Sequence, residues 1–109
     1  MIYELRTYKF REGMQDRLLA RFRDHTRAIF DRYGITSIGY WVQTEPADGA
    51  GDLIYIVSHP SREAAAAAWE AFRADPEWVK VKTATETDGP LHNGVVSQYM
   101  EATDFSAIK

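Results

Sequence analysis

The chain has 109 residues, no cysteine and a formal charge of −3, with 45% hydrophobic and 27% charged side chains. This length has room for one domain with one core, expected to span residues 1–109 with a short tail at 103–109. An acidic balance disfavours nucleic-acid partners, and the lack of cysteine excludes disulfides and thiolate chemistry. No apolar run is long enough for a membrane span and no leader-like segment opens the sequence, so we expect a cytoplasmic protein.

Residues 1–10 are rich in β-forming side chains that alternate along the chain, which predicts a strand. From Met14 onward, apolar side chains recur every three or four residues, as they do on one side of a helix. Gly34 is well placed as the C′ residue that ends this helix. The predicted buried stripe consists of Met14, Leu18, Phe22, His25, Ile29 and Tyr33.

Two further strands are predicted at 35–44 and 53–58, joined by turn-forming residues 45–51 in a β-hairpin. Pro60 ends the second of them. An alanine-rich helix at 62–74 follows, with Ser61 as its cap. A second helix is expected to restart at 75–77, where Asp75 caps it and Pro76 takes the first helical position. The last strand covers 92–102.

The order is therefore β-α-β-β-α(α)-β, which predicts an α+β domain with a ferredoxin-like, four-stranded antiparallel sheet. Helices in this arrangement cover one face of the sheet. The strand at 53–58 is nevertheless apolar on both faces, because Ile54 and Ile56 alternate with Leu53, Tyr55 and Val57. A second copy of the chain, packed sheet against sheet as a homodimer, is the economical cover for the other face.

Several spaced motifs run along the whole chain. They are Tyr3-Glu4-Leu5-Arg6-Thr7-Tyr8, Gly13, Tyr33-Gly34-Ile35, Gly39-Tyr40-Trp41, Ala74-Asp75-Pro76-Glu77-Trp78 and Asp104-Phe105-Ser106. Together they resemble the NIPSNAP family. The resemblance implies a dimeric α+β barrel, in which two ferredoxin-like sheets pack face to face. Related families include antibiotic-biosynthesis and haem-degrading monooxygenases, lactone isomerases and stress-responsive barrels. Because the NIPSNAP branch has no generally settled activity, the resemblance predicts the fold better than the function.

His25 is the first candidate for chemistry, because the predicted stripe places it on the sheet-facing side of its helix. A half-buried imidazole there would serve as a general base or a haem ligand. The alternative is a core histidine that hydrogen-bonds to one partner. His59 and His92 lie far away at strand ends, with no metal-ligand spacing around any histidine, so no metal site is predicted.

Glu4, Arg6 and Tyr8 share one face of the first strand. One interpretation is a substrate clamp, in which Arg6 binds a carboxylate or enolate and Tyr8 supplies a hydroxyl. The favoured alternative is a structural ion pair, either within the chain or with the second subunit. Since this set is more polar than its neighbours Tyr3, Leu5 and Thr7, we expect it to face the partner subunit or the barrel interior.

Aromatic side chains are numerous for so short a chain. Most should be core, but a few would line a pocket between helices and sheet for a small hydrophobic or aromatic ligand. The candidates for this pocket are Tyr40, Trp41, Tyr55 and Trp78.

Three functions follow from these patterns. The first is a small-molecule-binding dimer, or a cofactor-independent enzyme of the oxygenase or isomerase kind. Its base would be His25, and its polarising donors would be Arg6, Tyr8 or Tyr40. The second is a non-enzymatic dimeric module for protein interaction or stress response. The third is haem binding through His25. No phosphate-binding loop and no nucleophilic-serine motif is present in the sequence.

Overall fold

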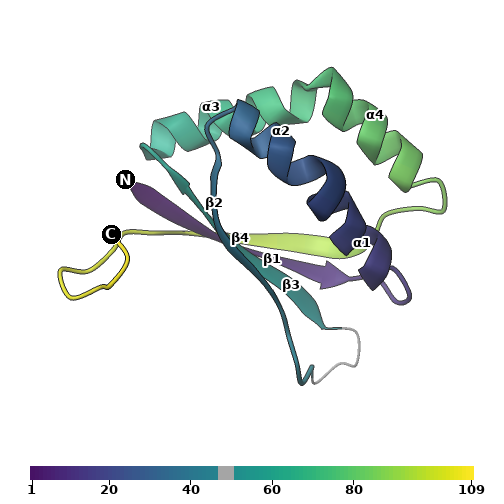
Figure 1. Cartoon of the computed structure of the whole chain (residues 1–109), viewed down its shortest axis with the longest axis horizontal. Helices are drawn as coiled ribbons and strands as arrows, with labels where there is room; N and C mark the ends of the chain where they lie inside the picture. The colour runs from purple at the N-terminus through teal and green to yellow at the C-terminus, as the bar shows by residue number, and fades with distance from the viewer. Residues whose placement is uncertain (47–50) are drawn as a thin grey trace.

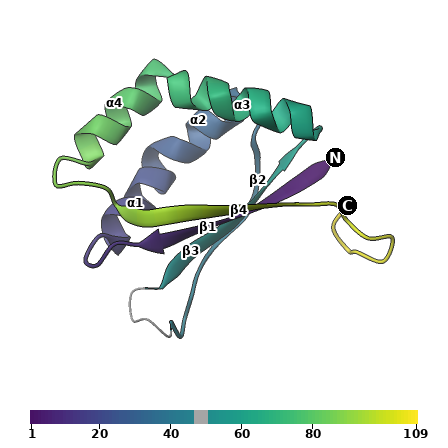
Figure 2. The same ribbon diagram turned by 180° about the vertical axis from the view of Figure 1, so that it is seen from behind.

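Four strands form one sheet in the order β2-β3-β1-β4, and every neighbouring pair is antiparallel. They are β1 (Ile2–Phe10), β2 (Thr36–Val42), β3 (Asp52–His59) and β4 (His92–Met100). The computed structural model describes residues 1–46 and 51–109. All the helices lie on one face of the sheet (Figure 1), and the view from behind shows β4 in front as an edge strand (Figure 2). The predicted α+β, ferredoxin-like sheet is confirmed.

The helical segments also follow the predicted order. The first comprises α1 (Gln15–Arg21), a π-helical turn η1 (Phe22–Thr26) and α2 (Arg27–Arg32), and the second comprises α3 (Arg62–Ala74) and α4 (Pro76–Thr85). Ser61 and Asp75 cap α3 and α4 through their side chains, as predicted. Gly34 adopts a φ of 74°, which suits glycine and ends the first helix. None of the described helices is both long and apolar enough to span a bilayer.

The π turn η1 overturns the predicted position of His25. A π turn takes in one residue more than an α-helical turn, so the residues after it move around the helix axis by one position. Thr26 is consequently buried, with 2% of its surface exposed, while His25 is exposed. The prediction that the His25 imidazole faces the sheet, as a base or as a core histidine, is therefore wrong.

The two faces of β1 are also the reverse of the prediction. Glu4, Arg6 and Tyr8 face the helices, whereas the expectation placed them toward the partner subunit or the barrel interior. The physical reason is that the helix side supplies polar partners for these groups. Trp69 from α3 and His59 from β3 both reach Glu4, so the carboxylate is fully buried without being unpaired.

The core lies between the helices and the sheet and is dominated by aromatic side chains. Phe30 packs against both Trp69 and Phe72, with ring centroids 5.3 Å and 5.1 Å apart. Tyr55 occupies the middle of the sheet with none of its surface exposed, and it contacts Phe22 from η1. These contacts fix the first helix and α3 to the same sheet face and so define the walls of the space between them.

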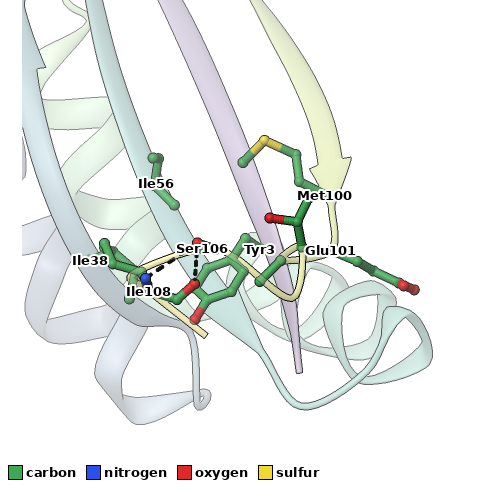
Figure 3. Close-up of a pocket in the computed structure, with 9 residues that line it drawn as sticks. Tyr3, Ile38, Ile56, Met100, Glu101, Ser106 and Ile108 are labelled. Carbon is green, nitrogen blue, oxygen red and sulfur yellow. Dashed lines mark hydrogen bonds between the residues drawn. The ribbon is translucent and has the colours of Figure 1, made fainter.

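The opposite face of the sheet carries no helix. Ile38, Trp41 and Val96 expose 38%, 52% and 60% of their surfaces there. Figure 3 shows that the tail after Met100 bends back over one end of this face, where Ile108 lies near Tyr3. The rest of this far face, with Leu5 and Ile54 among others, is not covered by another segment of the chain.

The strand boundaries agree with the predicted ones to within two residues. Of the predicted turn at 45–51, residues 47–50 lie outside the described residues. β2 is also irregular, because the register with β3 shifts between Ser37 and Gly39. Ile38 is the extra residue of this bulge, and it points to the far face, where it lines the hollow beside Ile56.

Candidate functional site

A buried carboxylate connects four elements on the helix side of the sheet. Glu4 Oε1 accepts hydrogen bonds from Trp69 Nε1 and His59 Nε2, each at 2.8 Å. Glu4 Oε2 accepts from Arg6 Nη1 at 2.9 Å and from Ser97 Oγ at 2.5 Å. Each carboxylate oxygen thus has two donors, which is close to the full capacity of the group.

Burial alone would raise the pKa of Glu4. The four donors act in the opposite direction and prevail, with His59 contributing most, so the pKa falls to about 2. Glu4 is therefore ionised throughout the physiological range. The predicted ion pair with Arg6 is present, and it lies within one chain.

Arg6 is held in place by its neighbours on three sides. Its Nε donates to Tyr55 Oη at 2.8 Å and its Nη2 to Tyr8 Oη at 3.1 Å, while Nη1 contacts Glu4. The guanidinium also lies over the Trp69 ring, 4.2 Å from its centroid. A guanidinium has five N–H donors, so two remain available on a group whose position is fixed. Burial raises the pKa of Tyr55, which keeps its proton and donates to Tyr8 Oη at 3.1 Å.

Arg6 and Tyr8 form part of the floor of a pocket of about 240 Å³ between the sheet and the helices. The sheet side includes His92 and Val95 from β4, and the helix side combines residues of the first helix, α3 and α4. The aromatic part of the lining consists of Tyr8, Phe22, Trp69, Phe72 and Trp78. Such a mixture of ring faces and a few fixed polar groups is typical of small-molecule sites.

The charged part of the lining is mostly cationic. Arg21 is buried and pairs with Glu86 at 2.7 Å, yet its Nε is buried with no partner among the described residues. Arg73 and Lys82 line the outer part of the pocket and are exposed. Burial lowers the pKa of His92, and the nearby Arg21 guanidinium lowers it further, which keeps this imidazole neutral.

The predicted site residues divide between this pocket and other places. Arg6, Tyr8 and Trp78 line it, and Tyr55 lies beneath it as a fully buried hydrogen-bond partner of Arg6. Tyr40 lines a separate shallow hollow beside Phe22.

Two of the predicted residues lie away from the pocket. Trp41 is wrong as a pocket residue, because the strand alternation places it on the far face. His25 lines an outer surface groove between the first helix and α4, not the helix–sheet space.

Sequence reasoning did not select Arg21, Arg73, Lys82 and His92 for this site. A signal existed for Arg21, which lies directly between the stripe residues Leu18 and Phe22 at the edge of the buried face. No such signal existed for His92, since its contact with the Tyr8 ring depends on how β4 pairs with β1. Among residues 1–46 and 51–109, no three histidine or acidic side chains cluster as metal ligands.

These features define a class of protein: a ferredoxin-like α+β domain with an aromatic, cationic pocket between its helices and its sheet. The sequence profile of the NIPSNAP family matches residues 3–107. The chain therefore belongs to the NIPSNAP family, as its motifs indicated. No curated protein sequence matches it.

Solved structures support the fold. The chain is similar to the protein Atu4242 from Agrobacterium tumefaciens, with a TM-score of 0.84 and 22% identity over 100% of both chains. It is also similar to an uncharacterised NIPSNAP domain protein from Burkholderia xenovorans, with a TM-score of 0.80 and 22% identity over 97% of this chain and 98% of the other. A more distant likeness is to SnoaB, a cofactor-independent oxygenase from Streptomyces nogalater, with a TM-score of 0.59 and 16% identity over 99% and 97% of the two chains.

Proposed function

We propose that the protein is a homodimer that binds a small organic molecule in the helix–sheet pocket of each chain. The observation that carries the proposal is the fixed Arg6 guanidinium. It lies at the floor of a pocket with aromatic walls and retains N–H donors that no described side chain uses. Glu4 balances the charge of Arg6, so what the guanidinium still lacks is an acceptor for these remaining donors, which a bound molecule would supply.

The pocket has groups suited to chemistry on such a molecule. Arg6 and Tyr8 supply donors toward the pocket from one strand, and they would stabilise negative charge that develops on a bound carbonyl or phenol. A cofactor-independent oxygenase or isomerase reaction is the enzymatic form of this proposal. The shared fold with SnoaB supports that direction only as an analogy between folds.

The homodimer is proposed from the far face of the sheet. Most of its side chains are apolar or uncharged, and they include Leu5, Ile54, Val96 and Gln98. The charged side chains at the end of this face, Lys9 and Asp52, have opposite signs and lie 3.9 Å apart. Two identical faces that carry no net charge can pack against each other, so the surface is suited to its own copy. A sheet packed on this side leaves the pocket on the opposite side accessible.

The tryptophan side chains allow a direct test of the pocket. The chain has three, of which Trp69 and Trp78 line the pocket and Trp41 lies on the far face. In a ¹H–¹⁵N spectrum of the labelled protein, planar aromatic compounds of one or two rings are expected to shift the indole signals of Trp69 and Trp78. The Trp41 signal serves as the internal control and should stay in place. If the aromatic compounds shift only the Trp41 signal, or shift none of the three indole signals, the proposal is overturned.

A further inference from the structure

The pocket carries an excess of positive charge. Arg6, Arg21, Arg73 and Lys82 line it, whereas Glu4 and Glu86 are the carboxylates that form ion pairs with these side chains in the described part of the chain. Neither Arg73 nor Lys82 forms an ion pair with a described residue, although the whole protein has a charge of −3. The local excess therefore opposes the overall charge, and low-dielectric walls strengthen such a field.

The cations lie at two depths. Arg6 exposes 15% of its side chain and Arg21 only 2%, so both belong to the inner part of the pocket. The inner cations retain unused donors: two N–H groups of Arg6, and the buried Nε of Arg21. A buried donor without a partner costs free energy unless a bound group accepts from it. Arg73 and Lys82 are the exposed cations of the lining, and from there they would attract an anion from solution.

The remaining lining restricts the shape of what binds. Trp69 and Trp78 line a space of about 240 Å³, which is below the usual range for drug-sized ligands. Rings of this kind favour a flat, unsaturated body of one or two rings. His92 is held neutral beside them, so it adds a hydrogen-bonding group without adding charge.

From these observations we infer that the ligand is a small organic anion with a planar, unsaturated body, whose carboxylate or enolate oxygens lie against Arg6. The inference rests on the proposed function and names the class of molecule that this pocket takes. The inner arginines select the acidic group, the aromatic walls select the flat body, and the outer cations raise the rate of entry.

Matched pairs of ligands test this class. Benzoate, 2-naphthoate and indole-3-carboxylate are each compared with the corresponding neutral amide, which has nearly the same size and shape. Isothermal titration calorimetry at low salt is expected to show at least one acid that binds tenfold or more tightly than its amide. The preference should decrease as salt is added, because the outer cations are exposed.

Variants locate the charge selection. Lys82→Gln is expected to weaken binding of the acid severalfold with little effect on the amide. Lys80→Gln is the matched control, since Lys80 is exposed on the same helix but does not line the pocket. Equal losses in the two variants would show a general charge effect and would contradict a role of the pocket.

The possible results separate the two proposals. If acids and amides bind equally tightly and both shift the Trp69 and Trp78 signals, the ligand class is not anionic. The proposed binding function would still hold in that case. Failure of every acid and every amide to bind would overturn both. If inorganic phosphate displaces the acid at a comparable concentration, the pocket selects negative charge but not a planar body. The inferred class would then be overturned as well.

Discussion

At the scale of single residues, Glu4 is the group on which the site depends most. Its two oxygens bind side chains from β1, β3, α3 and β4, and two of these partners, Arg6 and Trp69, also line the pocket. Glu4 itself does not line the pocket. It acts through Arg6 and Trp69 as a positioning residue, which means that its loss should disturb both stability and binding.

Replacing Glu4 with glutamine tests this role through pH. The folded pKa of about 2 lies below the ordinary value of 4.5, so the stabilisation from the ionised group is complete above that ordinary value. It is lost as the pH falls through about 2. We expect Glu4→Gln to lower the free energy of unfolding at pH 7 by on the order of 3 kcal/mol. By pH 3 the difference from wild type should shrink to about half of this.

Urea unfolding at pH 7, 5 and 3 measures these differences. Glu70→Gln, at an exposed position of α3, is the control and should change stability by less than about 0.5 kcal/mol. A difference between wild type and Glu4→Gln that stays constant from pH 7 to pH 3 would mean that the pKa of Glu4 is not depressed by its partners.

Only part of the hydrogen-bond network around Glu4 could be predicted from the sequence. The pair with Arg6 was predictable, because residues two apart on a strand share a face. His59, Trp69 and Ser97 lie 55, 65 and 93 residues away from Glu4 in the chain. They reach it only through strand pairing and the docking of α3, and no local pattern specifies these.

At the scale of elements, the π turn in the first helix determines which residues face the sheet. The apolar spacing predicted the helix and its end at Gly34 correctly, but it assumed a constant period of 3.6 residues. The wide turn at Phe22–Thr26 takes in one extra residue, which turns His25 outward and Thr26 inward. The sequence contains no proline or glycine there to mark such a turn, so the error has a physical cause that the spacing does not reveal.

Deleting Asp24 tests the account of the turn. Asp24 is exposed within η1, and its removal should convert the π turn into a regular α-helical one, with the buried positions on both sides retained. We expect a folded protein that unfolds cooperatively in urea and loses no more than about 2 kcal/mol.

Deletion of the exposed Ala67 from α3 is the control. That helix has no wide turn, so the deletion would rotate Trp69 and Phe72 away from the core by about 100°. The control variant should lose its near-ultraviolet circular dichroism and its cooperative transition. If the two deletions destabilise the protein equally, the π turn does not hold an extra residue that the helix can lose without changing its buried positions.

At the scale of the whole molecule, the two faces of the sheet differ in what they carry. The helix face holds the pocket, with Arg6 at its floor, and the far face exposes apolar side chains such as Val96. The sequence predicted a two-faced sheet from the apolar alternation at 53–58 and from the family motifs. It could not assign the faces of β1, because a shift of one residue exchanges them and only the tertiary partners of Glu4 decide between the two.

The central claim is that one face binds a ligand while the other binds a second copy of the chain. Sedimentation equilibrium at micromolar concentration tests it most directly, with Val96→Lys beside wild type and with Val79→Lys, at an exposed position of α4, as control. We predict about twice the chain mass of 12.4 kDa for wild type and Val79→Lys. Val96→Lys should shift toward the single-chain mass while ligands still move its Trp69 and Trp78 signals. A wild-type protein that sediments as a strict monomer would contradict the account.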